Sequence, residues 1–347
     1  MSDPSGPPSS SDPSVTSPFD DFHQDVGSSL PAQEAMSGPP VTPISTPPGA
    51  FPQNLIGLIG DDHPPEFKKE GDDWVALFNP SNREGSNVNL LHTLEHSSVL
   101  EDEAADREGS LYLRGVCFSP DGKYLATGAE DKLIKVWNIE MKTIRNIFEG
   151  HTQEVYSIDY SSDGQLIVSG SGDKTVRVWN MEDGTSKLFT THEDNAGVTS
   201  VRFSSDGRYV AAGYMDDHVR IWEVATGQLV ERLRSHQDCI YSVAFTPGDK
   251  GLVSGSLDNT LKHWDVSNLS HSGNNNEARE SPCTMTFVGH KDFVLSVAVS
   301  RDGKHIASSS KDRGVIFWDP RDATAQCLLR GHKNSGMLAP YYSGVHV

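Results

Sequence analysis

Three sets of serine, histidine and aspartate recur in the second half of this chain, each with a tryptophan in the same phase. The His-to-Trp interval is 28 residues in every set. The sets are His151, Ser169, Asp173 and Trp179; His236, Ser254, Asp258 and Trp264; and His290, Ser308, Asp312 and Trp318. Serine, histidine and aspartate together are the side chains of nucleophilic hydrolases. An enzyme builds one such site, however, and no G-x-S-x-G elbow accompanies these residues. Three sets in register therefore indicate a structural role, and we predict that the chain is not an enzyme.

Four polar side chains that satisfy one another suit the inside of a repeat. A buried donor or acceptor without a partner costs about 1–3 kcal/mol, so a closed chain of hydrogen bonds is favoured there. Two further copies of the pattern are altered. One has Ala212 where serine is expected and a shifted His192, and the other keeps Thr127, Asp131 and Trp137 without a histidine at the right interval.

The elements that must position these residues follow from the tryptophan spacing. Tryptophans at 137, 179, 222, 264 and 318 lie 42, 43, 42 and 54 residues apart. Periods of 40–45 residues are typical of four-stranded propeller blades. Each unit contains a tight Asp-Gly turn, which supplies the positive φ of hairpins, except the fourth, which has Pro247-Gly248-Asp249. The sequence therefore predicts an all-β propeller with five complete blades.

The second unit illustrates the expected strands. We expect strands at 155–158, 167–171 and 175–179, with fourth strands such as 143–148 and, last in the chain, 326–330. The long interval contains 270–281, interpreted as a polar surface insertion. One more fourth-strand-like stretch, 90–96, precedes all five units.

Other candidate sites are weak. The stretch 170–175 lacks the G-x-x-x-x-G-K spacing of a phosphate loop and runs into a strand. The four cysteines form no C-x-x-C pair, so we expect apolar packing rather than zinc. Asn268-Leu269-Ser270 fits a glycosylation acceptor and is interpreted as a loop. We expect no metal, cofactor or small-molecule substrate.

Charge divides the chain. Of 347 residues, 29 are basic and 48 acidic, a net charge of −19, and residues 1–110 alone hold 19 acidic and 4 basic side chains, a net of −15. Fourteen of the 20 prolines lie in residues 1–65, which we predict to be a disordered leader. Residues 66–110 form an acidic segment leading to the repeats at 111–335, and 336–347 form an aberrant tail. The acidity excludes nonspecific DNA wrapping, and no apolar run is long enough to span a membrane. The first residues lack a secretory signal, which favours an intracellular protein.

The repeats resemble the WD-repeat family, including Gly150-His151, Gly289-His290, Gly331-His332, Trp264-Asp265 and Trp318-Asp319. In that family the four polar side chains form one hydrogen-bonded chain. More specifically, 113–131, 289–297 and 310–319, with 73–80 and 91–96, resemble the fungal Tup-family general transcriptional corepressors, which are Groucho-like. The resemblance covers roughly 72–335.

Two departures from that family stand out. Nothing in 1–65 resembles its helical tetramerisation segment, and its propeller has seven blades where this chain encodes five. The family continues into a full blade after Val99, whereas here a short acidic run leads directly to the next unit. We therefore expect a splice form or a faulty gene model, in preference to a truncated paralogue.

The resemblance implies a nuclear corepressor subunit that is recruited by DNA-bound repressors. It also implies contacts with a tetratricopeptide-repeat partner or histones, without direct nucleic-acid binding. The alternative is a general WD scaffold such as a ubiquitin-ligase substrate receptor. In WD propellers the start of each first strand lies at the top face, which predicts a partner-binding surface there. Its residues are Glu154, Tyr156, Asp238, Tyr241, Lys291, Asp292 and Phe293. The competing interpretation is that Tyr156 and Tyr241 simply pack between blades.

Overall fold

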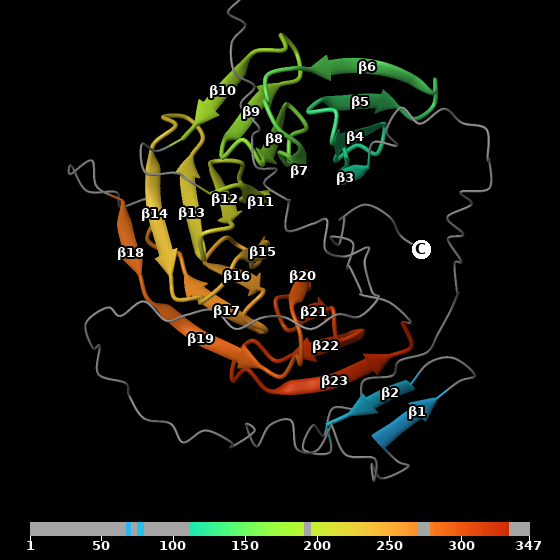
Figure 1. Cartoon of the computed structure of the whole chain (residues 1–347), viewed down its shortest axis with the longest axis vertical. Coiled ribbons are helices and arrows are strands. Elements are labelled where there is room, and N and C mark those ends of the chain that lie inside the picture. Colours follow the sequence, from blue (N-terminus) through green and yellow to red (C-terminus); the bar gives the residue numbers. More distant parts are fainter. Residues whose placement is uncertain (1–66, 71–74, 80–111, 191–195, 270–277, 333–347) are drawn as a thin grey trace, which may run out of the picture. The chain divides into compact units, whose positions relative to one another are not determined.

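Twenty-three β-strands make up more than half of the residues that the structure describes (Figure 1). The computed structural model describes residues 67–70, 75–79, 112–190, 196–269 and 278–332. All of them belong to one compact unit, Gly49–Val347. No helix in these ranges is long and apolar enough to cross a membrane.

Five antiparallel sheets correspond to the five sequence repeats. The first holds β3 (Leu113–Phe118), β4 (Tyr124–Ala129), β5 (Ile134–Asn138) and β6 (Thr143–Phe148). The second holds β7 (Val155–Tyr160), β8 (Leu166–Ser171), β9 (Val176–Asn180) and β10 (Ser186–Phe189). The third holds β11 (Val198–Phe203), β12 (Tyr209–Tyr214), β13 (His218–Glu223) and β14 (Leu229–Arg234). The fourth holds β15 (Ile240–Phe245), β16 (Gly251–Ser256), β17 (Thr260–Asp265) and β19 (Cys283–Val288). The fifth holds β20 (Val294–Val299), β21 (Ile306–Ser310), β22 (Gly314–Trp318) and β23 (Ala325–Arg330).

Neighbouring sheets pack through their first strands. β3 packs against β7, β7 against β11, β11 against β15 and β15 against β20. No comparable packing joins β20 to β3 among the residues that the structure describes. The cores lie between sheets: Phe148 of the first sheet, for example, stacks on Trp179 of the second at 5.4 Å between ring centroids. These are the blades of a β-propeller, which confirms the predicted fold class.

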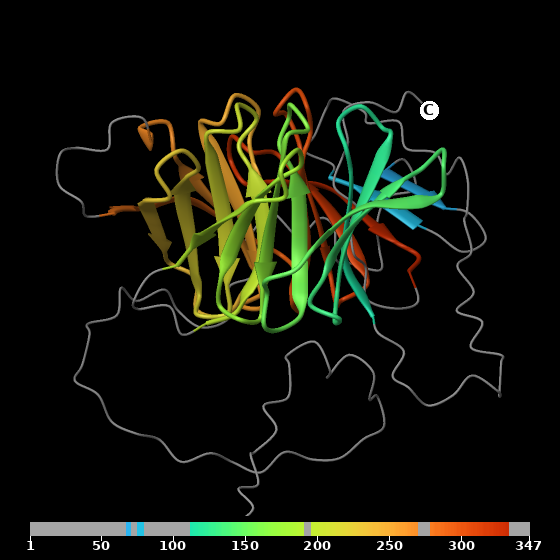
Figure 2. The ribbon, with the colours of Figure 1, turned by 90° about the horizontal axis from the view of Figure 1, so that it is seen from above.

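Each sheet has two ends, and the turn that follows its first strand lies at one of them (Figure 2). Gly164 has φ of +71°, and in the fourth unit Gly248 and Asp249 share the positive φ at +77° and +56°. Each first strand ends at such a turn, so the loop that leads into the strand lies at the opposite end of the sheet.

Three short strands were not predicted. β1 (Lys68–Glu70) pairs with β2 (Val75–Phe78), and β2 pairs antiparallel with β23, extending the fifth sheet to six strands. β18 (Arg279–Ser281) pairs in parallel with β14. The interpretation of 270–281 as a mere surface insertion is therefore wrong for its last three residues, because their backbone adds a strand to the third sheet.

Several predictions fall on residues outside the described ranges. These are the disordered leader 1–65, the strand-like stretch 90–96, His192, most of the insertion and the tail 336–347.

Candidate functional site

The second, fourth and fifth units each bring a tryptophan, a serine, a histidine and an aspartate into one hydrogen-bonded chain, here called a tetrad. In the second unit Trp179 Nε1 donates to Ser169 Oγ at 2.8 Å, and Ser169 Oγ lies 2.7 Å from His151 Nε2. His151 Nδ1 lies 2.9 Å from Asp173 Oδ2. The indole can only donate, so serine donates onward to Nε2, and the histidine donates from Nδ1 to the carboxylate.

The other two tetrads repeat this geometry closely. The indole-to-serine distances are 2.9 and 2.8 Å, the serine-to-histidine distances 2.8 and 2.7 Å, and the histidine-to-aspartate distances 2.7 and 2.9 Å. Strand pairing sets the register, because serine sits on the second strand and tryptophan on the third strand of the same sheet. Ser254 and Ser308 belong to this set, as do Asp258 and Asp312, and all three serines are completely buried.

The hydrogen bonds of each tetrad lower the pKa of its aspartate, which keeps the carboxylate charged. Burial raises the pKa of Asp312, but hydrogen bonds from His290 and from backbone amides outweigh it and hold the pKa at about 2. The same opposition leaves the pKa values of Asp173 and Asp258 well below their ordinary range. Burial lowers the pKa of His236, which favours a neutral ring at neutral pH.

The order aspartate, histidine, serine matches a hydrolytic triad, yet the serine cannot serve as a nucleophile. Ser169 is 0% exposed, and its oxygen already accepts the Trp179 indole. A substrate carbonyl would have to displace the tryptophan core to reach it. In these three tetrads the constellation is therefore a structural network.

The first and third units replace the tetrad. In the first, Trp137 donates to Thr127 at 3.0 Å, while Asp131 pairs with Lys135 at 2.6 Å. In the third, Ala212 offers no oxygen, and the buried Trp222 Nε1 has no hydrogen-bond partner among the described residues.

An ion pair stands where the third unit would have its histidine–aspartate bond. Arg220 Nη2 lies 2.7 Å from Asp216 Oδ2, and the Arg220 guanidinium lies over the Tyr214 ring at 4.1 Å from its centroid. This ion pair was not predicted. The spacing of Asp216 and Arg220, four residues apart, could have indicated it.

The tetrads hold the loops that carry the predicted partner surface. We call the three residues between each tetrad histidine and the next first strand a lead-in loop; these are 152–154, 237–239 and 291–293. The amides of Thr152, Gln237 and Lys291 donate to the Oδ2 atoms of the three tetrad aspartates at 2.9, 3.0 and 2.9 Å.

A second serine binds the middle residue of each lead-in loop. Ser171, Ser256 and Ser310 donate to the carbonyls of residues 153, 238 and 292 at 3.1, 2.9 and 2.9 Å. Side chains of the same sheet therefore hold the first and the middle residue of each loop.

The seven predicted partner residues differ in accessibility. Asp238 and Lys291 are exposed, while Glu154, Asp292 and Phe293 are half-buried in the lead-in loops. Tyr241 is half-buried, and Tyr156 is only 7% exposed. Tyr156 and Tyr241 occupy the same position in their strands, the second residue of β7 and of β15.

Tyr241 lies in a group drawn from three sheets. Burial raises its pKa above the ordinary range, and Arg114 of β3 and Tyr156 act on it electrostatically. Arg114 is bound to Glu130, with Nη2 2.5 Å from the carboxylate. Arg114 was not predicted, because the first unit lacks the tyrosine that marks this position in the second and fourth units.

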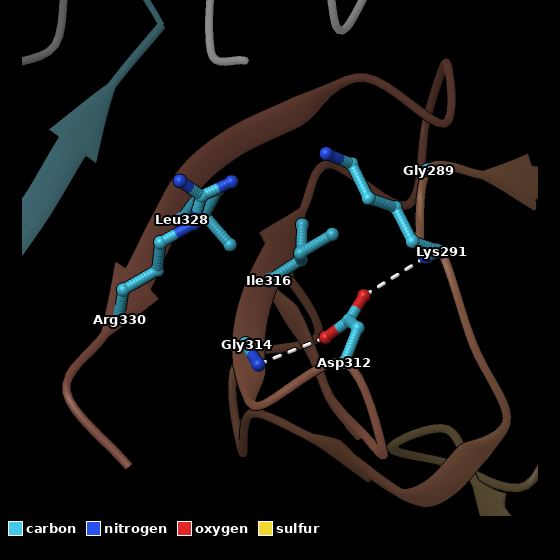
Figure 3. A pocket seen from close by; sticks show the side chains of 7 residues that line it. All are labelled: Gly289, Lys291, Asp312, Gly314, Ile316, Leu328 and Arg330. Carbon is cyan, nitrogen blue, oxygen red and sulfur yellow. Dashed lines mark hydrogen bonds between the residues drawn. The ribbon is translucent and has the colours of Figure 1, made fainter. Parts of the chain in front are cut away.

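The pocket beside the fifth lead-in loop is small (Figure 3). Asp312 lies at its base, bonded to the amides of Lys291 and Gly314, and Lys291 and Arg330 lie at its sides. Its volume is about 40 Å³, far below the roughly 300–1,000 Å³ of ligand pockets. Recognition here would therefore use loop side chains rather than a cavity.

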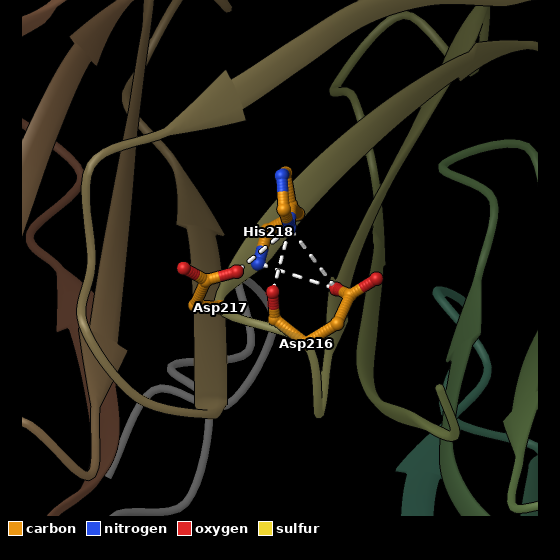
Figure 4. Close-up of side chains that lie close together, drawn as sticks. All are labelled: Asp216, Asp217 and His218. Carbon is orange, nitrogen blue, oxygen red and sulfur yellow. Dashed lines mark hydrogen bonds and ion pairs between the residues drawn. The ribbon is translucent and has the colours of Figure 1, made fainter. Parts of the chain in front are cut away.

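Asp216, Asp217 and His218 approach one another closely enough to suggest a metal site (Figure 4). Their polar atoms are already engaged. His218 Nδ1 lies 2.8 Å from Asp217 Oδ1 and 2.6 Å from the Asp216 carbonyl, and Arg220 neutralises Asp216. The cluster is explained as a turn and an ion pair.

Comparison with known proteins gives the following. The family described as "WD domain, G-beta repeat" matches residues 107–138, 142–180, 185–223, 227–265 and 281–319. The transcriptional repressor rco-1 of Neurospora crassa is 42% identical over 318 residues, covering 81% of this chain and 52% of that protein.

Two further fungal proteins are similar. The general transcriptional corepressor TUP1 of Saccharomyces cerevisiae is 49% identical over 257 residues, covering 72% of this chain and 35% of that protein. The transcriptional repressor tup12 of Schizosaccharomyces pombe is 41% identical over 296 residues, covering 75% and 49%. The chain thus spans about half the length, or less, of these relatives.

Proposed function

This chain belongs to the WD40-repeat family, and we propose that it is a transcriptional corepressor subunit that binds protein partners through its lead-in loops. The proposal rests on the double anchoring of these loops, by a tetrad aspartate at the first residue and by a second serine at the middle residue. Rigid loops lose little conformational freedom on binding, which favours specific recognition of another protein.

The chemistry of this surface suits a protein partner. Asp238 in the loop of the fourth unit and Lys291 in the loop of the fifth unit present opposite charges, and Phe293 follows Lys291 in the same loop. The Lys311 ammonium lies 5.4 Å from the centre of the Phe293 ring. Aromatic side chains bordered by charges are the composition of interface anchors.

Similarity to proteins named as transcriptional repressors and corepressors supports the biological role. Under this proposal the chain works in the nucleus. DNA-bound repressors recruit it, and it contacts a tetratricopeptide-repeat corepressor partner or histones. It binds no DNA itself.

Capture of partners from nuclear extract tests the proposal. The full chain is immobilised beside a variant carrying Asp238→Lys and Lys291→Glu. We expect the variant to lose roughly tenfold or more of the captured corepressor components, because both charges lie at the proposed contact. Its melting temperature should not change, since both side chains are exposed.

Lys304→Glu provides the matched control. Its side chain is 76% exposed and lies beside an Asp-Gly turn, at the end of the sheet opposite the lead-in loops. Equal capture by the double variant and by the control would contradict the proposal. Recovery of ubiquitin-ligase subunits without corepressor components would favour the substrate-receptor alternative.

A further inference from the structure

The first sheet exposes apolar residues whose counterparts in the other four sheets are buried. Leu113 and Val116, the first and fourth residues of β3, are 63% and 48% exposed. The counterparts of Leu113 are Val155, Val198, Ile240 and Val294, all 0% exposed. The counterparts of Val116 are Ile158, Val201, Val243 and Val297, which are 2, 0, 0 and 6% exposed.

In the other sheets, the preceding sheet packs on the first strand and on the tryptophan of the next sheet. A glycine on its second strand lets the incoming side chain approach the backbone: a Cβ at Gly170 would lie 2.5 Å from Val198, and one at Gly255 would lie 2.7 Å from Val294. A ring on its fourth strand covers the next tryptophan. The stacked or edge-on pairs are Phe148–Trp179, Phe189–Trp222 and Phe287–Trp318, at 5.4, 5.9 and 5.7 Å.

The apolar face extends across the whole first sheet. Register places Val116 beside Thr127 and Leu125 beside Trp137, and Trp137 in turn beside Ile144 of β6. Trp137 is half-buried, whereas the other four repeat tryptophans are at most 2% exposed. Ile144 is 42% exposed.

Charges on this sheet are already neutralised within the chain. Lys135 pairs with Asp131 at 2.6 Å, and Arg114 pairs with Glu130 at 2.5 Å. Covering the face would therefore bury no unpaired charge, and two such faces would not repel one another.

We propose that two copies of this chain associate through this face, the first sheet of one copy packing on the first sheet of the other. The exposed side chains of this face are mainly apolar, and its Lys135 is paired with Asp131, so the face can pack on its own copy about a two-fold axis. Facing sheets of this kind pack about 10 Å apart with interdigitated side chains. The contact closes at two copies.

A head-to-tail contact between the fifth and first sheets fits less well. The fifth sheet has Ser309 at the position of Gly170 and Gly255, opposite Ser296 of β20 in the strand register. A serine Cβ there would meet an incoming Leu113 as the glycine positions show, at under 3 Å. The fifth sheet is thus not shaped to receive the first sheet of another copy.

The size of the face sets the strength of the dimer. Four strands about 4.8 Å apart, each of about six residues rising about 3.3 Å, give a face of roughly 300 Å² in each copy. The two faces together cover roughly 600 Å², below the roughly 1,200 Å² at which stable interfaces begin, so the dimer should be weak, with a dissociation constant on the order of 10 μM or higher.

Sedimentation equilibrium of the full chain from about 1 to 100 μM tests this proposal over the range in which such a dimer would form. We expect a monomer–dimer equilibrium that Val116→Lys weakens by at least roughly tenfold, because it places an unpaired charge in the proposed contact. Leu113→Lys should act in the same direction. Val288→Lys is the matched control, since Val288 is a valine 45% exposed on the fourth sheet and its variant should dimerise as the natural chain does.

A chain that stays monomeric at every concentration overturns the proposal. So does a dimer that Val116→Lys and Val288→Lys weaken equally. Protection of β3 amides from exchange at concentrations where the chain is monomeric would show that another segment of the same chain covers the face, and would overturn it as well.

Discussion

Complete tetrads stand in the second, fourth and fifth units, while the first and third units hold their tryptophans differently. Trp264 is fully buried and bonded to Ser254, whereas Trp222 is equally buried with no partner for its indole nitrogen in the described part of the chain. Trp137 keeps a hydroxyl partner and is only half-buried. The fold thus tolerates the loss of one tetrad member when an ion pair or solvent takes over part of its role.

The difference also separates the loops. Each complete tetrad fixes a lead-in loop through its aspartate, as in the amide bond of Lys291 to Asp312. In the first unit the corresponding Asp131 forms an ion pair with Lys135 instead. The predicted partner surface lies on the three units with complete tetrads, which suggests that the network serves loop rigidity as much as stability.

The largest effect is expected for Ser254→Ala. The change leaves Trp264 Nε1 and His236 Nε2 buried without partners, which should lower the free energy of unfolding by about 2–4 kcal/mol. Urea denaturation measures it. A loss below about 1 kcal/mol would mean that complete and altered sets are energetically alike.

Acid titration should separate the tetrad carboxylates from ordinary ones. The folded pKa of Asp312 is depressed to about 2 from 3.8, so its stabilisation is present above pH 4 and is lost as pH falls towards 2. We expect the natural chain to lose about 1 kcal/mol more than Asp312→Asn over that interval, after allowing for partial exposure of the carboxylate. Parallel losses in the two proteins would argue against the bonded carboxylate.

Ala212→Ser should give the Trp222 indole nitrogen of the third unit a hydrogen-bond acceptor. A hydroxyl at this position lies where serine meets tryptophan in the complete tetrads, and should stabilise the fold by about 0.5–1.5 kcal/mol. Ala211→Ser is the control, because it places the same hydroxyl on the other face of β12, away from the indole. If neither variant, or both equally, raised the free energy of unfolding, the unpaired Trp222 Nε1 would not by itself destabilise the fold.

The smallest effect is expected for Thr127→Ala in the first unit. Water can replace the hydroxyl at the half-buried Trp137, so a loss of only about 0.5 kcal/mol is expected in the same denaturation assay. A loss as large as that of Ser254→Ala would place Trp137 in a fully desolvated environment, contrary to its accessibility.

Local patterns in the sequence predicted the five blades well. Strand β6 begins and ends at the predicted residues, Thr143 and Phe148, a run rich in β-branched residues that ends before Glu149-Gly150. The tetrad partners were predicted from their regular spacing together with the resemblance to the WD-repeat family, in which these four side chains form one hydrogen-bonded chain.

The strands added at sheet edges could not be predicted in this way. β2 and β18 join β23 and β14 through backbone hydrogen bonds, which require no alternating side-chain pattern. The sequence left two interpretations of Tyr156 open, an exposed partner contact and packing between blades, because its burial depends on how neighbouring sheets approach one another. The exposure of β3 could not be predicted from its apolar residues, which match those of the buried strands, because it depends on whether a preceding sheet packs on it, and none does among the described residues.

We propose that the lead-in loops held by complete tetrads mediate repression. The most direct measurement is the output of a reporter gene to which the full chain is tethered through a heterologous DNA-binding domain. The natural chain and Lys304→Glu should repress equally, while Asp238→Lys combined with Lys291→Glu should lose most of the repression at the same protein level. Repression that survives this double change undiminished would contradict the account.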